Sequence, residues 1–116
     1  MLTITMKHRG TFSVACANDN QCGYVGKQEY DYAVEIVAFE GDLQKQNGFI
    51  LDTEDINHLF DSITEVRSGE ERAIESALDL EKLLEKRGVP FAELHFEIWG
   101  SNKTSFVAKI KKHLIN

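Results

Sequence analysis

The chain has 116 residues, of which 42% are hydrophobic and 28% charged, and its formal net charge is -6. This length accommodates one domain, residues 1–116, and excludes two independent cores, while the composition excludes a disordered chain. The negative charge disfavours nucleic acid as a partner. No apolar run approaches the roughly 20 residues that span a bilayer, and Met1 to Gly10 lacks the apolar core of a signal peptide. We therefore expect a cytoplasmic protein with no membrane partner, in which Cys16 and Cys22 stay reduced.

Two long stretches alternate polar and apolar residues, as β-strands do. The first runs from Leu2 to Ala17, and the second from about Gln28 to Glu40. One face of the second strand is apolar and carries Tyr30, Tyr32, Val34, Ile36 and Ala38. The other face carries Glu29, Asp31 and Glu35, and is therefore too polar for a dry core.

A helix is predicted after a short strand at Phe49–Leu51. Asp52 or Thr53 suits its N-cap, and Gly69 suits the position just past its end. The apolar residues between them fall at helical spacing: Ile56, Leu59, Phe60, Ile63 and Val66.

A second helix is predicted from about Glu70 to Arg87, with an apolar side formed by Ile74, Ala77, Leu78, Leu80 and Leu84. Gly88 is expected to form a left-handed cap, and Pro90 prevents continuation of the helix. Leu94, Phe96 and Ile98 then alternate as a strand, whereas the segment 104–115 fits either a strand or a helix.

This order of elements predicts an α+β fold, with two consecutive helices on one face of a mainly antiparallel sheet. The polar face of the sheet would then meet solvent, or line a water-filled barrel formed with other subunits.

Several short segments resemble the family of 6-pyruvoyl-tetrahydropterin and 6-carboxy-tetrahydropterin synthases, whose fold is called the T-fold. Residues 12–16, Phe-Ser-Val-Ala-Cys, resemble a Phe-Ser-Ala-Ala-His motif on the first strand. Residues 22–30 resemble a cysteine followed four residues later by His-Gly-His-x-Tyr. Residues 48–52 and 94–98 are similar to the segment before the first helix and to the final strand of that family. The resemblance implies a T-fold that assembles with further copies of itself into an oligomeric barrel.

The family's histidines bind a catalytic zinc ion, and this sequence departs from the pattern at those positions. Cys16, Gly26 and Gln28 stand there, and a single thiolate does not supply the three protein ligands that catalytic zinc needs. We therefore expect neither a metal nor another cofactor. A replacement site that combines Cys16 and Cys22 with a histidine elsewhere in the chain stays open.

The resemblance leads to four candidate site residues, Cys22 as the catalytic one and Tyr30, Asp52 and Glu97 as ligand-binding ones. Cys22 matches the family's catalytic thiol, Tyr30 matches the tyrosine of the second motif, and Asp52 matches the aspartate of the segment before the first helix. Ile98 stands at the position of the glutamate that anchors the pterin. Glu97, one residue earlier, could take that role only if a β-bulge shifted the strand register.

The resemblance implies a divergent pterin-synthase-like protein without synthase activity, an oligomer that binds a pterin- or purine-like ligand. Aromatic residues such as Trp99 offer planar surfaces for such a ring, although aromatic residues on strands are more often part of the core. One alternative is a metal-independent lyase or synthase of pterin type that uses Cys22. Another is a structural or protein-interaction module with no small-molecule ligand.

Overall fold

The structure is a computed structural model, and it describes residues 2–15, 27–44, 51–63, 69–99 and 104–112. Four strands form one sheet in the order β1-β2-β3-β4, and each neighbouring pair is antiparallel. The strands are β1 (Thr3–Ala15), β2 (Lys27–Phe39), β3 (Glu93–Trp99) and β4 (Ser105–Lys111). The helices are α2 (Glu40–Gln44), α3 (Thr53–Asp61) and α4 (Gly69–Lys86).

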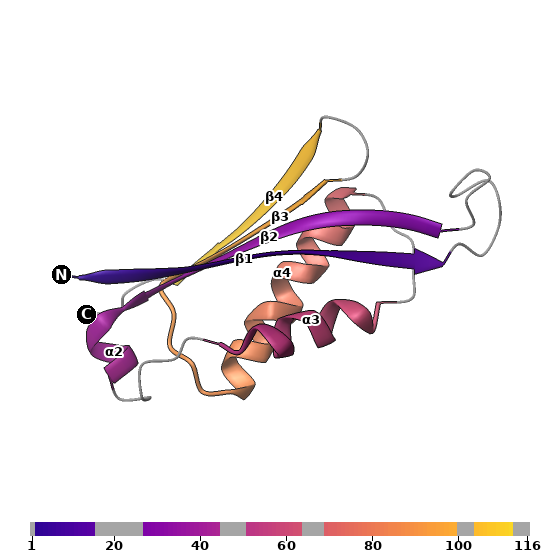
Figure 1. The fold of residues 1–116 in the computed structure, drawn as a ribbon. Helices are drawn as coiled ribbons and strands as arrows, with labels where there is room; N and C mark the ends of the chain where they lie inside the picture. Colours follow the sequence, from indigo (N-terminus) through magenta and orange to yellow (C-terminus); the bar gives the residue numbers. More distant parts are fainter. Residues whose placement is uncertain (1, 16–26, 45–50, 64–68, 100–103, 113–116) are drawn as a thin grey trace.

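Helices α3 and α4 follow one another along the chain and pack on the same face of the sheet (Figure 1). The α+β architecture predicted from the sequence is therefore confirmed. The segment 105–111 is a strand rather than a helix, because it pairs along its whole length with β3. Among the described residues, we find no helix with the length and apolar character needed to cross a membrane.

The face of the sheet toward the helices forms one side of the hydrophobic core. It carries the alternating residues predicted for β2 and β3, of which Tyr32, Val34, Ile36, Leu94, Phe96 and Ile98 are almost fully buried. At the centre, the Phe60 ring of α3 meets aromatic rings from three strands. Its centroid lies 5.5 Å from that of Phe12, 4.3 Å from that of Tyr32 and 5.3 Å from that of Phe96. This aromatic cluster fixes α3 against the sheet.

Asp52 caps α3 as predicted, with its Oδ1 atom accepting a hydrogen bond of 2.9 Å from the backbone N–H of Glu54. The helix is shorter than predicted, however, and ends at Asp61. Gly69 does not end this helix but begins α4, and here the sequence interpretation was wrong. A Cβ atom on Gly69 would lie 2.4 Å from Cδ2 of Phe106, so this glycine permits a close contact between α4 and β4.

The buried side of α4 is as predicted at Ala77, Leu80 and Leu84, but the prediction was wrong for Ile74 and Leu78. Ala73, Ala77, Leu80 and Leu84 face the core, whereas Ile74 and Leu78 are 56% and 45% exposed. Ala73 and Ala77 are small and allow α4 to approach β3 and β4. Successive residues of a helix point about 100° apart, so Ile74 and Leu78, which follow these alanines, point away from the core. Arg72 and Ser76, which precede the two alanines, are buried in place of Ile74 and Leu78.

The remaining predictions for the connections have mixed outcomes. Gly88 follows α4 with a φ of 69°, the left-handed cap that was expected. Directly after β2 the chain forms the short helix α2, which was not predicted from the sequence. In the predicted strand 49–51, residues 49 and 50 lie outside the described part, and Leu51 is a buried residue that belongs to no strand.

Candidate functional site

The face of the sheet opposite α3 and α4 carries mostly polar side chains, and within the described residues no helix covers it (Figure 1). We call it the open face. It contains the alternate residues of each strand, among them Lys7, Arg9, Thr11, Glu29, Asp31, Ala33, Glu35, Val37, Glu93, His95, Glu97, Trp99, Ser105, Val107, Lys109 and Lys111. Because the strands keep a continuous register, these residues form rows across the sheet. The rows bring together residues that are far apart in the sequence.

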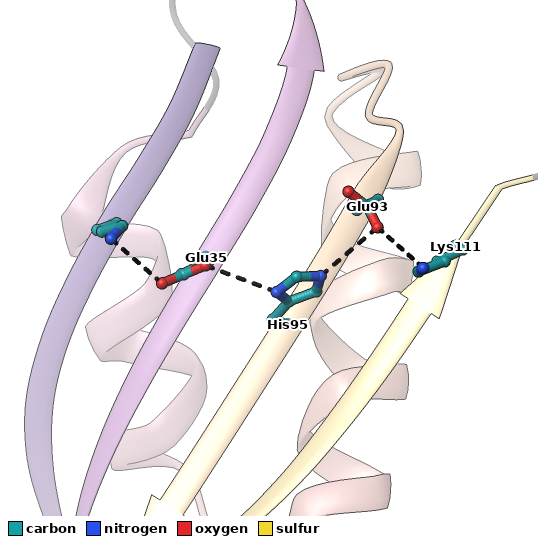
Figure 2. Close-up of polar contacts among 5 residues, drawn as sticks. Glu35, Glu93, His95 and Lys111 are labelled. Atoms are coloured by element: carbon teal, nitrogen blue, oxygen red, sulfur yellow. Dashed lines mark ion pairs between the residues drawn. The ribbon is translucent and has the colours of Figure 1, made fainter. Parts of the chain in front are cut away.

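One group of charged residues forms a chain of ion pairs across the open face (Figure 2). Lys7 Nζ lies 3.5 Å from Glu35 Oε1, and Glu35 Oε2 lies 3.5 Å from His95 Nδ1. Glu93 Oε1 lies 3.8 Å from His95 Nε2 and 3.6 Å from Lys111 Nζ. The carboxylates of Glu35 and Glu93 thus each lie close to a lysine and to a ring nitrogen of His95, which is charged only when protonated. Among the described residues, the buried His95 Nε2 atom has no hydrogen-bond partner.

A hollow of 320 Å³ lies farther along the same face, lined by Arg9, Gly10, Thr11, Asp31, Tyr32 and Trp99. We call it the Asp31 pocket. The strand register explains its composition, because Thr11 pairs with Asp31 across β1 and β2, and Asp31 pairs with Trp99 across β2 and β3. Its volume is at the lower end of the range for small-molecule sites.

Two charged side chains of the Asp31 pocket differ from those in the chain of ion pairs. Within the described part of the chain, the side chains of Arg9 and Asp31 form no hydrogen bond or ion pair, and the Trp99 ring makes no aromatic contact. The pocket therefore offers a planar indole, a carboxylate that accepts hydrogen bonds and a guanidinium that donates them. A flat heterocycle with polar groups on its edge matches this combination.

Glu97 lies on the open face in β3, between Trp99 of the Asp31 pocket and His95 of the chain of ion pairs. Its Oε2 atom accepts a hydrogen bond of 2.8 Å from the hydroxyl of Ser105. Strand β3 keeps an unbroken register with both neighbours from Glu93 to Trp99, so no β-bulge shifts Glu97. Ile98, at the position of the family's anchoring glutamate, points into the core and is 1% exposed. Glu97 therefore does not replace that anchor.

The other candidate residues from the sequence lie elsewhere. Tyr30 is buried on the helix side of the sheet, with its ring centroid 5.1 Å from that of Phe12. Asp52 caps α3, and its carboxylate accepts a hydrogen bond from the backbone N–H of Glu54. Cys22 lies outside the described residues. The structure thus places Tyr30 and Glu97 on opposite faces of the sheet and does not bring them into one site.

On the helix side of the sheet, the hydroxyl of the buried Tyr32 belongs to a separate group of hydrogen bonds. The Tyr32 hydroxyl donates to Asn57 Oδ1 over 3.3 Å, and His8 Nε2 donates to the same oxygen over 3.1 Å. Burial raises the pKa of Tyr32 above its ordinary value of 10.0, and the charge of Asp61 raises it further. Tyr32 therefore stays protonated and ties β2 to α3. Its ring passes close to Gly10, where a Cβ atom would lie 2.5 Å from the Tyr32 hydroxyl oxygen.

Tyr30 has a comparable environment nearer the end of the sheet. Burial raises the pKa of its hydroxyl, and the positive charge of Arg72 acts in the opposite direction. Arg72 itself is 4% exposed, and its Nη1 atom lies 3.8 Å from Glu75 Oε2. The phenol is therefore neutral at physiological pH and fits the core in that form.

A metal site receives no support from the described residues, where no group of three His, Cys, Asp or Glu side chains is placed to hold an ion. The side chains at the family's zinc positions are not among those described. Cys16 and Gly26 lie outside the described part of the chain, and for Gln28 only the backbone, in β2, is described. The predicted loss of the zinc site stays a prediction.

Comparisons with known proteins bear on the fold. The chain matches no protein-family profile and no curated protein sequence. It is similar to the crystal structure of an archaeosine synthase QueF-like protein in the apo form, with a TM-score of 0.57 and 19% identity. The match covers 92% of this chain and 91% of that one. At this identity the likeness concerns the fold, and it supports a T-fold-like arrangement without indicating membership of the pterin synthase family.

The sequence interpretation did not include Arg9, Thr11 and Asp31 among the site residues. The alternation of β2 did indicate that Asp31 lies on the polar face, and Arg9 has the same parity as Lys7 in β1. These signals identify the face of each strand. Asp31 and Trp99 lie side by side because β2 pairs with β3, although they are 68 positions apart in the sequence. The alternation within a strand carries no information about this pairing.

Proposed function

We propose that this protein is an oligomeric T-fold-like binder of a flat pterin- or purine-like heterocycle, without zinc-dependent synthase activity. The Asp31 pocket is the ligand site in this proposal. The observation that carries it is the presence of an indole, a carboxylate and a guanidinium around one hollow, all without partners in the described chain.

The chemistry of the pocket fits the edge that pterins and guanine-type purines share. Both rings carry an amino group beside a ring N–H, and a carboxylate can accept a hydrogen bond from each. In this proposal Asp31 accepts these two hydrogen bonds, Trp99 stacks on the ring, and Arg9 donates to a ring oxygen. A site built on such hydrogen bonds rejects rings that lack the donors.

The ligand class has additional support from one comparison and from the sequence motifs. The structural neighbour is named as an archaeosine synthase, and several segments of this sequence resemble those of pterin synthases. Both point toward heterocycles of this kind. Zinc-dependent turnover is not part of the proposal, because Cys16, Gly26 and Gln28 stand at the aligned ligand positions.

Self-assembly is part of the proposal because the described sheet has two edges. Strands β1 and β4 each pair on one side, and large apolar residues are exposed on both: Leu2 next to β1 is 62% exposed, Ile4 43% and Val107 50%. An edge strand is a template for pairing with another chain. Pairing of β1 in one copy with β4 in the next would extend the open face. Sedimentation of the full chain at micromolar concentration tests this part, and a monomer would contradict it.

Ligand binding is tested by calorimetry on the full chain with pterin, 9-methylguanine and 9-methyladenine. Pterin and 9-methylguanine should bind, whereas 9-methyladenine, which lacks the paired donors, should not. Asp31→Asn should weaken binding at least tenfold, the loss expected for hydrogen bonds to a charged group. Glu29→Gln, on the same strand and face but outside the pocket, is the matched control. Absence of binding to every ring would favour a structural module.

A further inference from the structure

We infer that Glu97 and Ser105 form a second part of the same site and bind a vicinal diol attached to the heterocycle. The ligand class is then a ribonucleoside or a pterin with a hydroxylated side chain, rather than a free base. This inference rests on the proposed function of the Asp31 pocket.

The position of Glu97 relative to the pocket supports the inference. Glu97 and Trp99 are alternate residues of β3, so both face the open side, and their Cα atoms are separated by about 7 Å at the usual rise of a strand. Across the sheet, Ala33 lies between Arg9 and Glu97 in one row of the register. The alanine adds only a methyl group between the two charged residues. A substituent on a ring stacked at Trp99 can pass over it toward Glu97.

The surroundings of Glu97 distinguish it from Glu35 and Glu93, two other glutamates on this face. Glu35 and Glu93 each lie close to a lysine and to His95. In the part of the chain that the structure describes, Glu97 forms no ion pair, and its side chain accepts a hydrogen bond from Ser105. Its carboxylate therefore retains the capacity to accept hydrogen bonds.

A vicinal diol is the ligand group that suits this carboxylate. An ionised carboxylate has about four acceptor positions, and Ser105 occupies one of them. Two adjacent hydroxyl groups can donate to the two carboxylate oxygens, as ribose hydroxyls do with an acidic residue in dinucleotide-binding folds. An anionic group such as a phosphate would instead be repelled by Glu97. The hydrogen bond from Ser105 holds the carboxylate in one orientation before the ligand arrives.

The experiment compares ligands that differ only in their hydroxyl groups, with calorimetry on the full unmodified chain. Guanosine should bind at least tenfold more tightly than 2′,3′-dideoxyguanosine, and neopterin at least tenfold more tightly than 6-propylpterin if the diol belongs to a pterin. A preference in either pair supports the inference and identifies the source of the diol. Equal affinities within both pairs would overturn it and leave the proposed ring binding intact. Absence of binding by all four would overturn the proposed function as well.

Variants assign the effect to the residue. Glu97→Gln should remove the preference for the diol while ring binding remains, and Ser105→Ala should reduce the preference. Glu93→Gln, on the same strand and face, is the control and should keep it. A diol preference that survives in Glu97→Gln would overturn the assignment to Glu97. If a variant does not fold, the comparison of ligands on the unmodified chain still tests whether the site binds a diol.

Discussion

Phe60 in α3 and Tyr32 in β2 hold their ring centroids 4.3 Å apart, and this contact joins the helix layer to the middle of the sheet. The Tyr32 ring packs in the core, and Tyr32 is also one of the residues that line the Asp31 pocket. Packing of the core and the shape of this pocket are thus linked through one residue.

Replacing Phe60 should destabilise the fold strongly. Phe60→Ala removes a 2% exposed ring that contacts three other aromatic rings, and we expect a loss of about 3–5 kcal/mol in the free energy of unfolding. Urea denaturation followed by circular dichroism measures it. Leu78→Ala is the control, because Leu78 is 45% exposed and should cost less than about 1 kcal/mol. Equal losses for the two variants would contradict the position of Phe60.

Two glycines in helices should respond oppositely to alanine. Gly69→Ala puts a Cβ atom 2.4 Å from the Phe106 ring, so α4 or the ring must move, and we expect a loss of about 1–3 kcal/mol. Gly41→Ala meets nothing within 4 Å and should raise stability by up to about 1 kcal/mol through helix propensity. Thermal unfolding of both variants checks the pair. A stabilising Gly69→Ala would show that the contact of α4 with β4 is looser than described.

The pKa of Tyr32 predicts a loss of stability in alkaline solution. The folded-state pKa is raised above the ordinary value of 10.0, so the unfolded chain loses this proton first. The stabilising contribution is therefore complete below pH 10 and is lost as the pH rises from there through the folded-state pKa. Tyr32→Phe should flatten the dependence by up to about 1.4 kcal/mol per pH unit in that window. The measurement is the free energy of unfolding at several pH values above 9. Identical slopes for both proteins would contradict the burial of the hydroxyl.

The chain of ion pairs on the open face should contribute little to stability. Lys7 and Glu35 are 72% and 38% exposed, and exposed pairs contribute about 0–1 kcal/mol because water and salt screen them. Lys7→Ala should therefore change the free energy of unfolding by less than about 1 kcal/mol, and added salt should reduce the difference. A loss of several kcal/mol would indicate that this part of the face is covered by another chain.

Local sequence patterns predicted the elements well where one physical requirement dominated. The alternation in β2 predicted the buried residues from Tyr30 to Ala38, and Asp52 and Gly88 were assigned to the correct ends of their helices. Gly69 was misassigned because a glycine suits both the end of a helix and a close contact, and only the position of Phe106 distinguishes them. Ile74 was misassigned because α4 has two neighbouring apolar sides, one with Ala73 and Ala77 and one with Ile74 and Leu78, and only the first faces the core.

The candidate site was less predictable than the fold. Its residues come from β1, β2 and β3, and they meet because of the cross-strand register rather than because of a spacing within one segment. Resemblance to the pterin synthases indicated a ligand class but directed attention to Tyr30 and Asp52, whose side chains serve the core and a helix cap. Trp99 was considered as a planar surface, yet its neighbour Asp31 became apparent only from the folded sheet.

Fluorescence of Trp99 provides the most direct test of ligand binding in the Asp31 pocket, because the chain contains a single tryptophan. Titration with guanosine should change the emission of the unmodified protein along a saturable curve, since the ring stacks on the indole. Asp31→Asn should require at least tenfold more guanosine, and Glu29→Gln should behave as the unmodified protein does. An emission that does not change with guanosine, or a curve that Asp31→Asn leaves unaltered, would contradict binding in this pocket.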